Sequence, residues 1–366
     1  MEENIRSRRL GVYVAAPMLA MAALAAWTLP ASAQSVADVA KMTGPDRMAK
    51  LEAGARKEGE VMNYTTMLVE SGIRPLEEGF TKKYPYIKFN HYRANTSAMI
   101  QRILAEERAG KPVADVIVAT ASHALVTAKI AQSFNSPELA AYPKEYTGPD
   151  NLWGTSRVTY SVIGYNTKLV AAADVPKSWD DLLLPKYKGK MIWGDALDSG
   201  GPLVILHLLK TMGDKRAHEY FDKLAAQEVA SSSASGRAIT DLVVAGEHAM
   251  NISAAGPHVV DSKSSGASVE FVSFDPVIAR TDQLQLLVSA PHPHAAMLLI
   301  DYILSEEGQR NQVSTNEMGA HPKVLPNPAL QPIIPRLTGK SEIIYMPQDT
   351  ADIADELMDI YKKISR

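Results

Sequence analysis

The sequence predicts an α/β protein of two lobes joined by two extended segments. Short apolar runs typical of strands alternate with amphipathic helical segments, which favours a mostly parallel sheet. The run at residues 115–119 is apolar at nearly every position, as in a strand buried on both faces. Two β-rich segments, at 157–165 and near 271–280, are long enough to cross between lobes.

The first part of the chain repeats a strand–helix–strand order. We expect a helix over residues 36–57, a strand over 60–64 and a second strand over 86–93. The segment between the two strands has apolar residues at helical spacing and ends before Pro85. This order is that of a βαβ unit.

The same order then recurs. Residues 95–97 can cap a helix whose apolar stripe includes Met99 and Ile103, and the strand at 115–119 follows it. We therefore place residues 34–155, with about 278–366, in a first lobe with the C-terminal helices, and residues 156–277 in a second lobe. Further helical patterns occur at residues 204–209, 242–246, 295–304 and 353–364.

The N-terminus has the pattern of a cleavable export signal. Arg6, Arg8 and Arg9 precede an apolar run over residues 14–29, and small residues follow. We predict cleavage after Ala33 and a location in the periplasm. The run is shorter than the roughly 20 residues that a membrane-spanning helix needs. Both the general and the twin-arginine export routes fit this pattern.

Composition excludes several classes of protein. The chain has no cysteine, which removes disulfides, thiolate metal sites, cysteine nucleophiles and a lipid-anchored cysteine. Its net charge of −3 argues against a nucleic-acid surface. There is no Gly-x-Ser-x-Gly elbow, P-loop or HExxH motif, so we expect no enzymatic activity and no cofactor. His292 and His294 have no third ligand nearby in the sequence, so we interpret them as solvated and not as a metal pair.

Short words spread over most of the chain carry a resemblance to a known family. These are ARKEGE at 55–60, FTKKYP at 80–85, ADVI at 114–117, GYNT at 164–167, WDDL at 179–182, PKYKGK at 185–190, DYILS at 301–305 and GQ at 308–309. In their order and spacing the chain resembles the extracellular solute-binding proteins of ABC importers (family 1), in the iron(III)-type branch. The resemblance implies a type II periplasmic binding fold. It also implies a ligand between the lobes and closure by a hinge motion that the transporter recognises. The expected partners are a small ligand and the permease and ATPase subunits in the inner membrane, and the protein is expected to be a monomer.

Candidate ligand-binding residues lie where predicted strands end, because ligands of open α/β sheets bind beyond the carboxyl ends of strands. Each group has a purely structural alternative, a helix cap or a tight turn. The candidates are Tyr64, Thr65 and Thr66 after the first strand, Thr120 and Ser122 after the 115–119 strand, Ser199, Gly200 and Gly201 before a helix, and Ser253.

The residues favour an anion over ferric iron. Ferric members of the branch resemble this chain near residues 251–256, but this chain has Ser253 and two alanines where they carry a tyrosine pair. We therefore predict a small organic or phosphorus-containing anion, held by hydroxyls and helix N-termini. Arg93 or Arg280 can supply charge, or can instead form salt bridges. Three alternatives stay open: ferric iron at a site without tyrosines or with a synergistic anion, a ligand-sensing partner of a membrane receptor kinase, and a periplasmic enzyme on the same fold.

Overall fold

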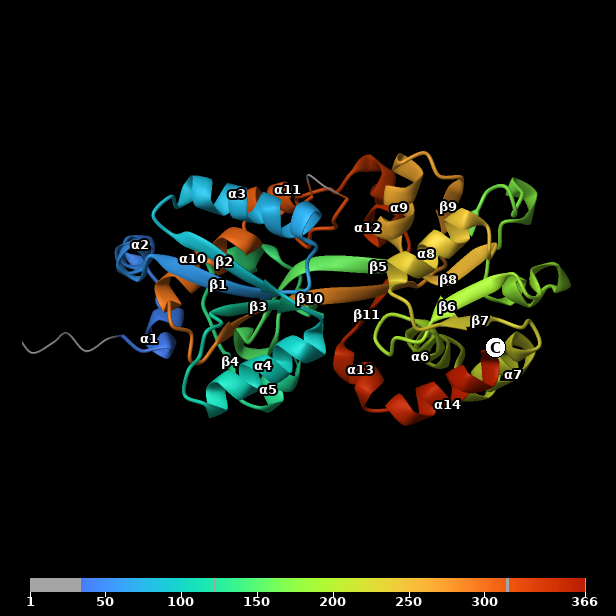
Figure 1. Ribbon diagram of the computed structural model, residues 1–366, viewed down its shortest axis with the longest axis horizontal. Coiled ribbons are helices and arrows are strands. Elements are labelled where there is room, and N and C mark those ends of the chain that lie inside the picture. Colours follow the sequence, from blue (N-terminus) through green and yellow to red (C-terminus); the bar gives the residue numbers. More distant parts are fainter. Residues whose placement is uncertain (1–33, 121–122, 314–315, 366) are drawn as a thin grey trace, which may run out of the picture. The chain divides into compact units, whose positions relative to one another are not determined.

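The computed structural model describes residues 34–120, 123–313 and 316–365 (Figure 1). The predicted export signal and Ser122 lie outside these residues. The strands are β1 (Glu60–Thr65), β2 (Lys88–Arg93), β3 (Val116–Ala119), β4 (Ala131–Gln132), β5 (Gly154–Asn166), β6 (Met191–Gly194), β7 (Ala230–Ser232), β8 (Met250–Ala255), β9 (Val269–Val272), β10 (Val277–Leu287) and β11 (Glu342–Tyr345). The α-helices are α1 (Val36–Ala40), α2 (Arg47–Glu58), α3 (Arg74–Lys83), α4 (Thr96–Arg108), α5 (His123–Thr127), α6 (Gly201–Met212), α7 (Asp214–Ala225), α8 (Gly236–Ala245), α9 (Gly256–Ser264), α10 (Pro293–Leu304), α11 (Glu306–Gln312), α12 (Pro335–Thr338), α13 (Pro347–Ala351) and α14 (Ala354–Ile364).

The strands pair in the order β2-β1-β3-β10-β5-β8-β6-β7. The pairs β1–β2, β1–β3, β6–β7 and β6–β8 are parallel. In the centre, β10 is antiparallel to both β3 and β5, and β5 is antiparallel to β8. The expectation of a mostly parallel sheet therefore holds for its outer parts and is wrong for its centre. The first half of β5 pairs with β10 and its second half with β8 and β9, so β5 joins two sheets.

Two predicted elements differ from the structure for identifiable reasons. The helix expected over residues 36–57 is divided into α1 and α2, because Gly44 has a φ of +86° and Pro45 follows it. The second crossing strand, β10, begins at Val277 instead of near residue 271, because residues 269–272 form the separate strand β9.

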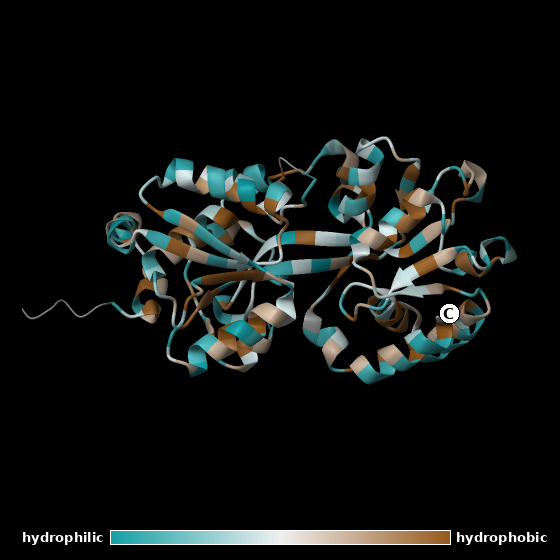
Figure 2. Ribbon diagram, in the orientation of Figure 1, coloured by the Kyte–Doolittle hydropathy of each residue, from teal (hydrophilic) through white to brown (hydrophobic). Residues whose placement is uncertain are grey.

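Apolar residues concentrate in the strands and in the inner helices, as Figure 2 shows for α6. The first lobe, the elements around β1 to β3, has α10 packed against α2. Arg47 of α2 and Asp301 of α10 form an ion pair with Nη1–Oδ2 at 2.5 Å, and both side chains are less than a tenth exposed. Within the described residues, no helix has the length and apolar character needed to cross a membrane.

The second lobe, the elements around β6 to β8, includes the C-terminal helix in its core. Helix α14 packs against α6 and α7. The rings of Tyr361 and Trp193 lie 5.2 Å apart, and Trp193 Nε1 donates to Ser365 Oγ at 2.9 Å. The C-terminal residues thus complete the packing of the second lobe. The placement of the C-terminal helix with the first lobe is therefore wrong for α14, and the other lobe boundaries stay a prediction.

His292 and His294 bond to carboxylates, contrary to the interpretation that they are solvated. Asp115 accepts hydrogen bonds from the backbone N–H of His292, at 2.7 Å, and from that of Met62. His292 Nδ1 lies 2.9 Å from Asp115 Oδ2, and His294 Nδ1 lies 2.6 Å from Glu58 Oε1. Among the described residues, no cluster of three or more histidine or acidic side chains is suited to a metal ion.

The His292–Asp115 pair predicts a pH-dependent contribution to stability. The hydrogen bond to Asp115 raises the pKa of His292 above its usual 6.5, although partial burial opposes this. Because the protonated ring is favoured in the folded state, His292 contributes its full stabilisation below the unfolded-state pKa of 6.5. This stabilisation is lost as pH rises through the higher folded-state pKa. In urea unfolding, the wild type should exceed His292→Gln in free energy of unfolding at pH 6, and the difference should shrink by pH 9. A difference that is constant or grows with pH would contradict this assignment.

Candidate functional site

A cavity of about 680 Å³ is lined by residues from both lobes and from the two joining strands. Its volume lies in the range of roughly 300–1,000 Å³ that is usual for small-molecule sites. The lining residues are Thr66, Leu68, Ser71, Arg93, Thr120, Arg157, Thr159, Ser235, Gly236, Arg237, Ala255, Pro257, His258, Asp261, Arg280, Asp282, Asn316 and Glu317.

The first lobe contributes the carboxyl ends of three neighbouring strands. Arg93 ends β2, Thr66 directly follows β1, and Thr120 directly follows β3. Parallel pairing of β1 with β2 and β3 brings these ends to one edge of the sheet. The Arg93 Nε donates to the carbonyl oxygen of Met67 at 2.9 Å, and the buried Thr66 Oγ1 has no partner among the described residues. This edge therefore offers the Arg93 guanidinium to a ligand, while the Thr66 hydroxyl is buried beside the cavity.

The joining strands contribute an ordered ion-pair network. Arg157 of β5 donates from Nε to Asp282 Oδ2 at 2.5 Å and from Nη1 to Glu317 Oε2 at 2.8 Å. Thr120 Oγ1 donates to Asp282 Oδ1 at 2.8 Å. The β5–β10 register shifts beside Asp282, and such a bulge re-aims side chains. Asp282 and Glu317 thus both bond to Arg157, whose single positive charge offsets one of their two negative charges.

Arg280 of β10 lines the same cavity but forms no ion pair with a carboxylate among the described residues. Its Nε is buried without a hydrogen-bond partner in the described part of the chain. Burial lowers the pKa of Arg280, nearby Asp198 and Asp282 raise it, and Arg157 lowers it again. A guanidinium stays protonated at neutral pH in spite of such shifts. Arg280 therefore places a positive charge at the cavity without a carboxylate in ion-pair contact among the described residues.

The second lobe contributes the N-terminal ends of α8 and α9. Ser235 caps α8, with its Oγ accepting from the N–H of Ala238 at 3.3 Å, and Ala255 precedes α9. Arg237 of α8 bonds Asp241 at 3.1 Å and lies 3.7 Å from Asp261 of α9. The positive ends of two helix dipoles thus add to the charge of the arginines.

Of the sequence-predicted ligand residues, Thr66 and Thr120 line the cavity, as do Arg93 and Arg280. Tyr64 is fully buried and its hydroxyl donates to Glu106 at 2.6 Å, while Thr65 Oγ1 accepts from the N–H of Met67. These two side chains are engaged within the first lobe.

The predicted residues of the second lobe have other contacts. Ser253 Oγ accepts from the N–H of Gly194 at 3.3 Å, and Ser199 Oγ donates to Asp198. Gly200 and Gly201 start α6, where a Cβ on Gly200 would lie 2.3 Å from the carbonyl oxygen of Gly194. These glycines allow close packing at the helix start. Asp198 in this loop lines a smaller pocket together with Arg280, and its negative charge raises the pKa of Arg280.

Other lining residues were not singled out from the sequence. The sequence predicts Arg157 only as the first residue of a crossing strand, and His258 belongs to no recognised motif. Asp261, Asn316 and Glu317 converge only in the folded chain, where Asn316 Nδ2 donates to Asp261 Oδ1. One sequence signal could have identified His258: it lies in the first turn of α9, two residues after Gly256, and helix N-termini favour anions.

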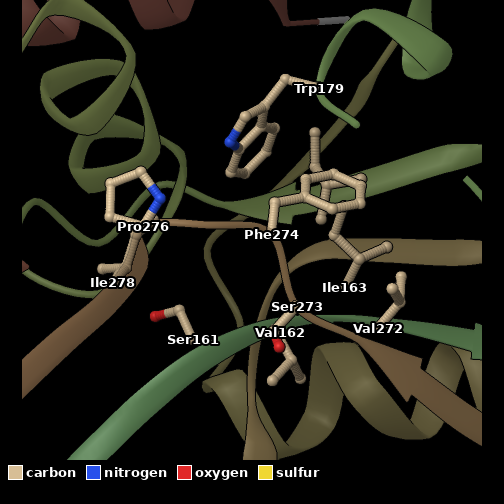
Figure 3. A pocket seen from close by; sticks show the side chains of 10 residues that line it. Ser161, Val162, Ile163, Trp179, Val272, Ser273, Phe274, Pro276 and Ile278 are labelled. Atoms are coloured by element: carbon tan, nitrogen blue, oxygen red, sulfur yellow. The ribbon is translucent and has the colours of Figure 1, made fainter. Parts of the chain in front are cut away.

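A second hollow lies beside Trp179 in the second lobe (Figure 3). The Trp179 and Phe274 rings meet edge to face at 5.2 Å, and Ser161 and Ser273 lie on the opposite side. Its volume is about 10 Å³, room for one water molecule at most. The larger cavity is therefore the candidate ligand site.

The fold matches that of solved periplasmic and transporter binding proteins. Iron-bound HitA from Pseudomonas aeruginosa is 21% identical with a TM-score of 0.68, and the match covers 84% of this chain and 99% of that one. AfuA from Actinobacillus pleuropneumoniae with fructose-6-phosphate is 20% identical with a TM-score of 0.66, covering 84% and 98%. The substrate-binding protein of an ABC transporter from Agrobacterium tumefaciens is 17% identical with a TM-score of 0.70, covering 85% and 97%. At these identities the likeness shows the fold, and the predicted type II periplasmic binding fold is confirmed.

The chain belongs to the bacterial extracellular solute-binding protein family, whose model matches residues 111–334, more than half of its length. It is thus a solute-binding protein and not an enzyme, as the sequence predicts. A comparison with curated proteins found no match.

Proposed function

We propose that this protein captures a small organic or phosphorus-containing anion in the 680 Å³ cavity for an ABC importer. The observation that carries this proposal is Arg280, a charged side chain that faces a ligand-sized cavity without a carboxylate partner among the described residues. Leaving such a group unpaired is costly, and an anionic ligand supplies the missing acceptor.

The remaining lining residues support an anion over a cation. Asp282 and Glu317 are already bonded to Arg157, and Asp261 lies near Arg237. Arg93 bonds only a backbone carbonyl in the described structure. Among the described residues, four arginines and three acidic side chains line the cavity, so its net charge is +1, and the N-terminal ends of α8 and α9 add to it.

Phenolate-bound ferric iron is not supported by the cavity, because no tyrosine lines it within the described residues. The relatives point to both ligand types: one solved structure holds iron and citrate, and another holds fructose-6-phosphate. Iron held with a synergistic anion is therefore a distinct outcome of the test below.

The location and the partners belong to the same proposal. The export signal cleaved after Ala33 would release a monomer into the periplasm, where the loaded protein would meet a permease and its ATPase. Thr66 and Thr120 would contact the ligand, since both line the cavity with Arg93 and Arg280.

The proposal is tested by thermal unfolding of residues 34–366 after ligand removal by unfolding and refolding. The panel holds phosphonates, sugar phosphates, citrate, small carboxylates, polyamines, and Fe³⁺ with and without citrate. A ligand that binds only the folded state stabilises it by about 2.7 kcal/mol at a hundredfold excess over its dissociation constant. We expect a rise in Tm with one organic or phosphorus-containing anion alone. A rise only with Fe³⁺, or only with a polyamine, would refute the proposal.

A further inference from the structure

His258 lies in the cavity between two cationic side chains and has an unused ring nitrogen. It is the third residue of α9, and it lines the cavity together with Arg237 of α8 and Arg280 of β10. Its Nδ1 is buried and has no hydrogen-bond partner among the described residues. Most buried polar side-chain atoms have partners, so this orphaned atom calls for an explanation.

The charges around His258 come from each element packed near it. Arg237 and Arg280 disfavour the protonated ring, and Asp261 on the next turn of α9 and the backbone of Gly236 favour it. Arg157 and Glu317 face the same cavity but bond to each other. On β9, Glu270 pairs with Lys263 at the far end of α9. Burial is the largest cause that lowers the pKa of His258 below 6.5, so the ring is neutral at pH 7 in the empty cavity.

We propose that His258 contacts the bound anion and takes up one proton from solvent as the anion enters, so that capture is stronger at lower pH. This inference rests on the proposed function. An anion beside Arg237 and Arg280 offsets the two charges that oppose protonation of the ring. The imidazolium has an N–H on both ring nitrogens and can donate a charge-assisted hydrogen bond to an anion oxygen, which is stronger than a bond donated by the neutral ring. His258 thereby couples ligand affinity to the pH outside the cell membrane.

The coupling is measured by isothermal titration calorimetry of the ligand-free protein with three probes: sulfate, inorganic phosphate and citrate. Titrations in two buffers of different ionisation enthalpy give the number of protons taken up. Sulfate does not titrate between pH 5 and 8, so proton uptake with sulfate comes from the protein. We expect uptake approaching one proton per bound sulfate, and affinity that falls by up to about tenfold per pH unit between the free and bound pKa values.

Two variants isolate the residue. His258→Gln should bind sulfate without proton uptake and with pH-independent affinity. His218→Gln, which changes an exposed histidine of α7, should behave as the wild type. Anion binding by the wild type without proton uptake, or uptake that persists in His258→Gln, would overturn this inference alone. If none of the three probes nor any anion of the thermal panel binds, the proposed function fails, and the inference fails with it.

Discussion

Replacing Arg280 with glutamine is expected to weaken anion binding by about 30- to 1,000-fold, the equivalent of roughly 2–4 kcal/mol. The reason is that glutamine keeps a hydrogen-bond donor but removes a charge, and of the other cavity arginines only Arg93 has no carboxylate partner in the described structure. Arg157 is held by Asp282 and Glu317, and Arg237 is shared with Asp241 and Asp261. Calorimetric titration with the anion selected by the thermal screen measures the effect.

The same substitution should leave the fold at least as stable as that of the wild type. Arg280 has a buried Nε without a partner, so its removal relieves a cost instead of breaking a native ion pair. Arg216→Gln is the matched control, since Arg216 lies on the surface of α7 and bonds only Asp180 in the described structure. Equal loss of affinity in both variants, or a large loss of stability in Arg280→Gln, would show that Arg280 is a structural residue.

The largest expected loss of stability follows Asp301→Asn, at about 3–5 kcal/mol. This substitution leaves the Arg47 guanidinium buried beside a neutral amide, with only the carbonyl oxygen of Asn135 as its other acceptor in the described residues. Because α2 and α10 pack through this pair, the first lobe should lose cooperativity first. Urea unfolding followed by circular dichroism measures the change.

Two controls separate the buried charge from the loss of the contact. Asp180→Asn removes an exposed pair with Arg216 and should cost at most about 1 kcal/mol. The double substitution Arg47→Met with Asp301→Leu should recover most of the lost stability, because two apolar side chains replace a charged pair of similar volume. A double variant as unstable as Asp301→Asn alone would argue that the hydrogen-bond geometry, and not the unpaired charge, is what matters.

The sequence predicts the fold well because its signals are local. The apolar run at residues 115–119 became the buried strand β3, and the 157–165 segment became part of β5. The split between α1 and α2 could have been foreseen from Gly44 and Pro45. The antiparallel centre could not, because it depends on how the distant strands β5 and β10 pair.

The site is only partly predictable for the same reason. The rule that ligands bind beyond strand ends identifies the positions of Thr66 and Thr120. It does not give the direction of each side chain, and Tyr64 turns instead to Glu106. Within the described residues, Arg93 and Arg280 have no carboxylate partner because Asp282 and Glu317 pair with Arg157 instead. The sequence does not show which arginine these carboxylates contact. His258 lines the cavity because the N-terminus of α9 lies at the cavity wall.

The central claim, that the cavity holds an anion against Arg280, is tested most directly by a crystal structure. Crystals should be grown with the anion that gives the largest thermal shift. We predict anion oxygens within roughly 2.7–2.9 Å of the Arg280 guanidinium nitrogens. An anion bound outside the cavity would contradict the claim, and so would a bound ferric ion whose anion makes no contact with Arg280.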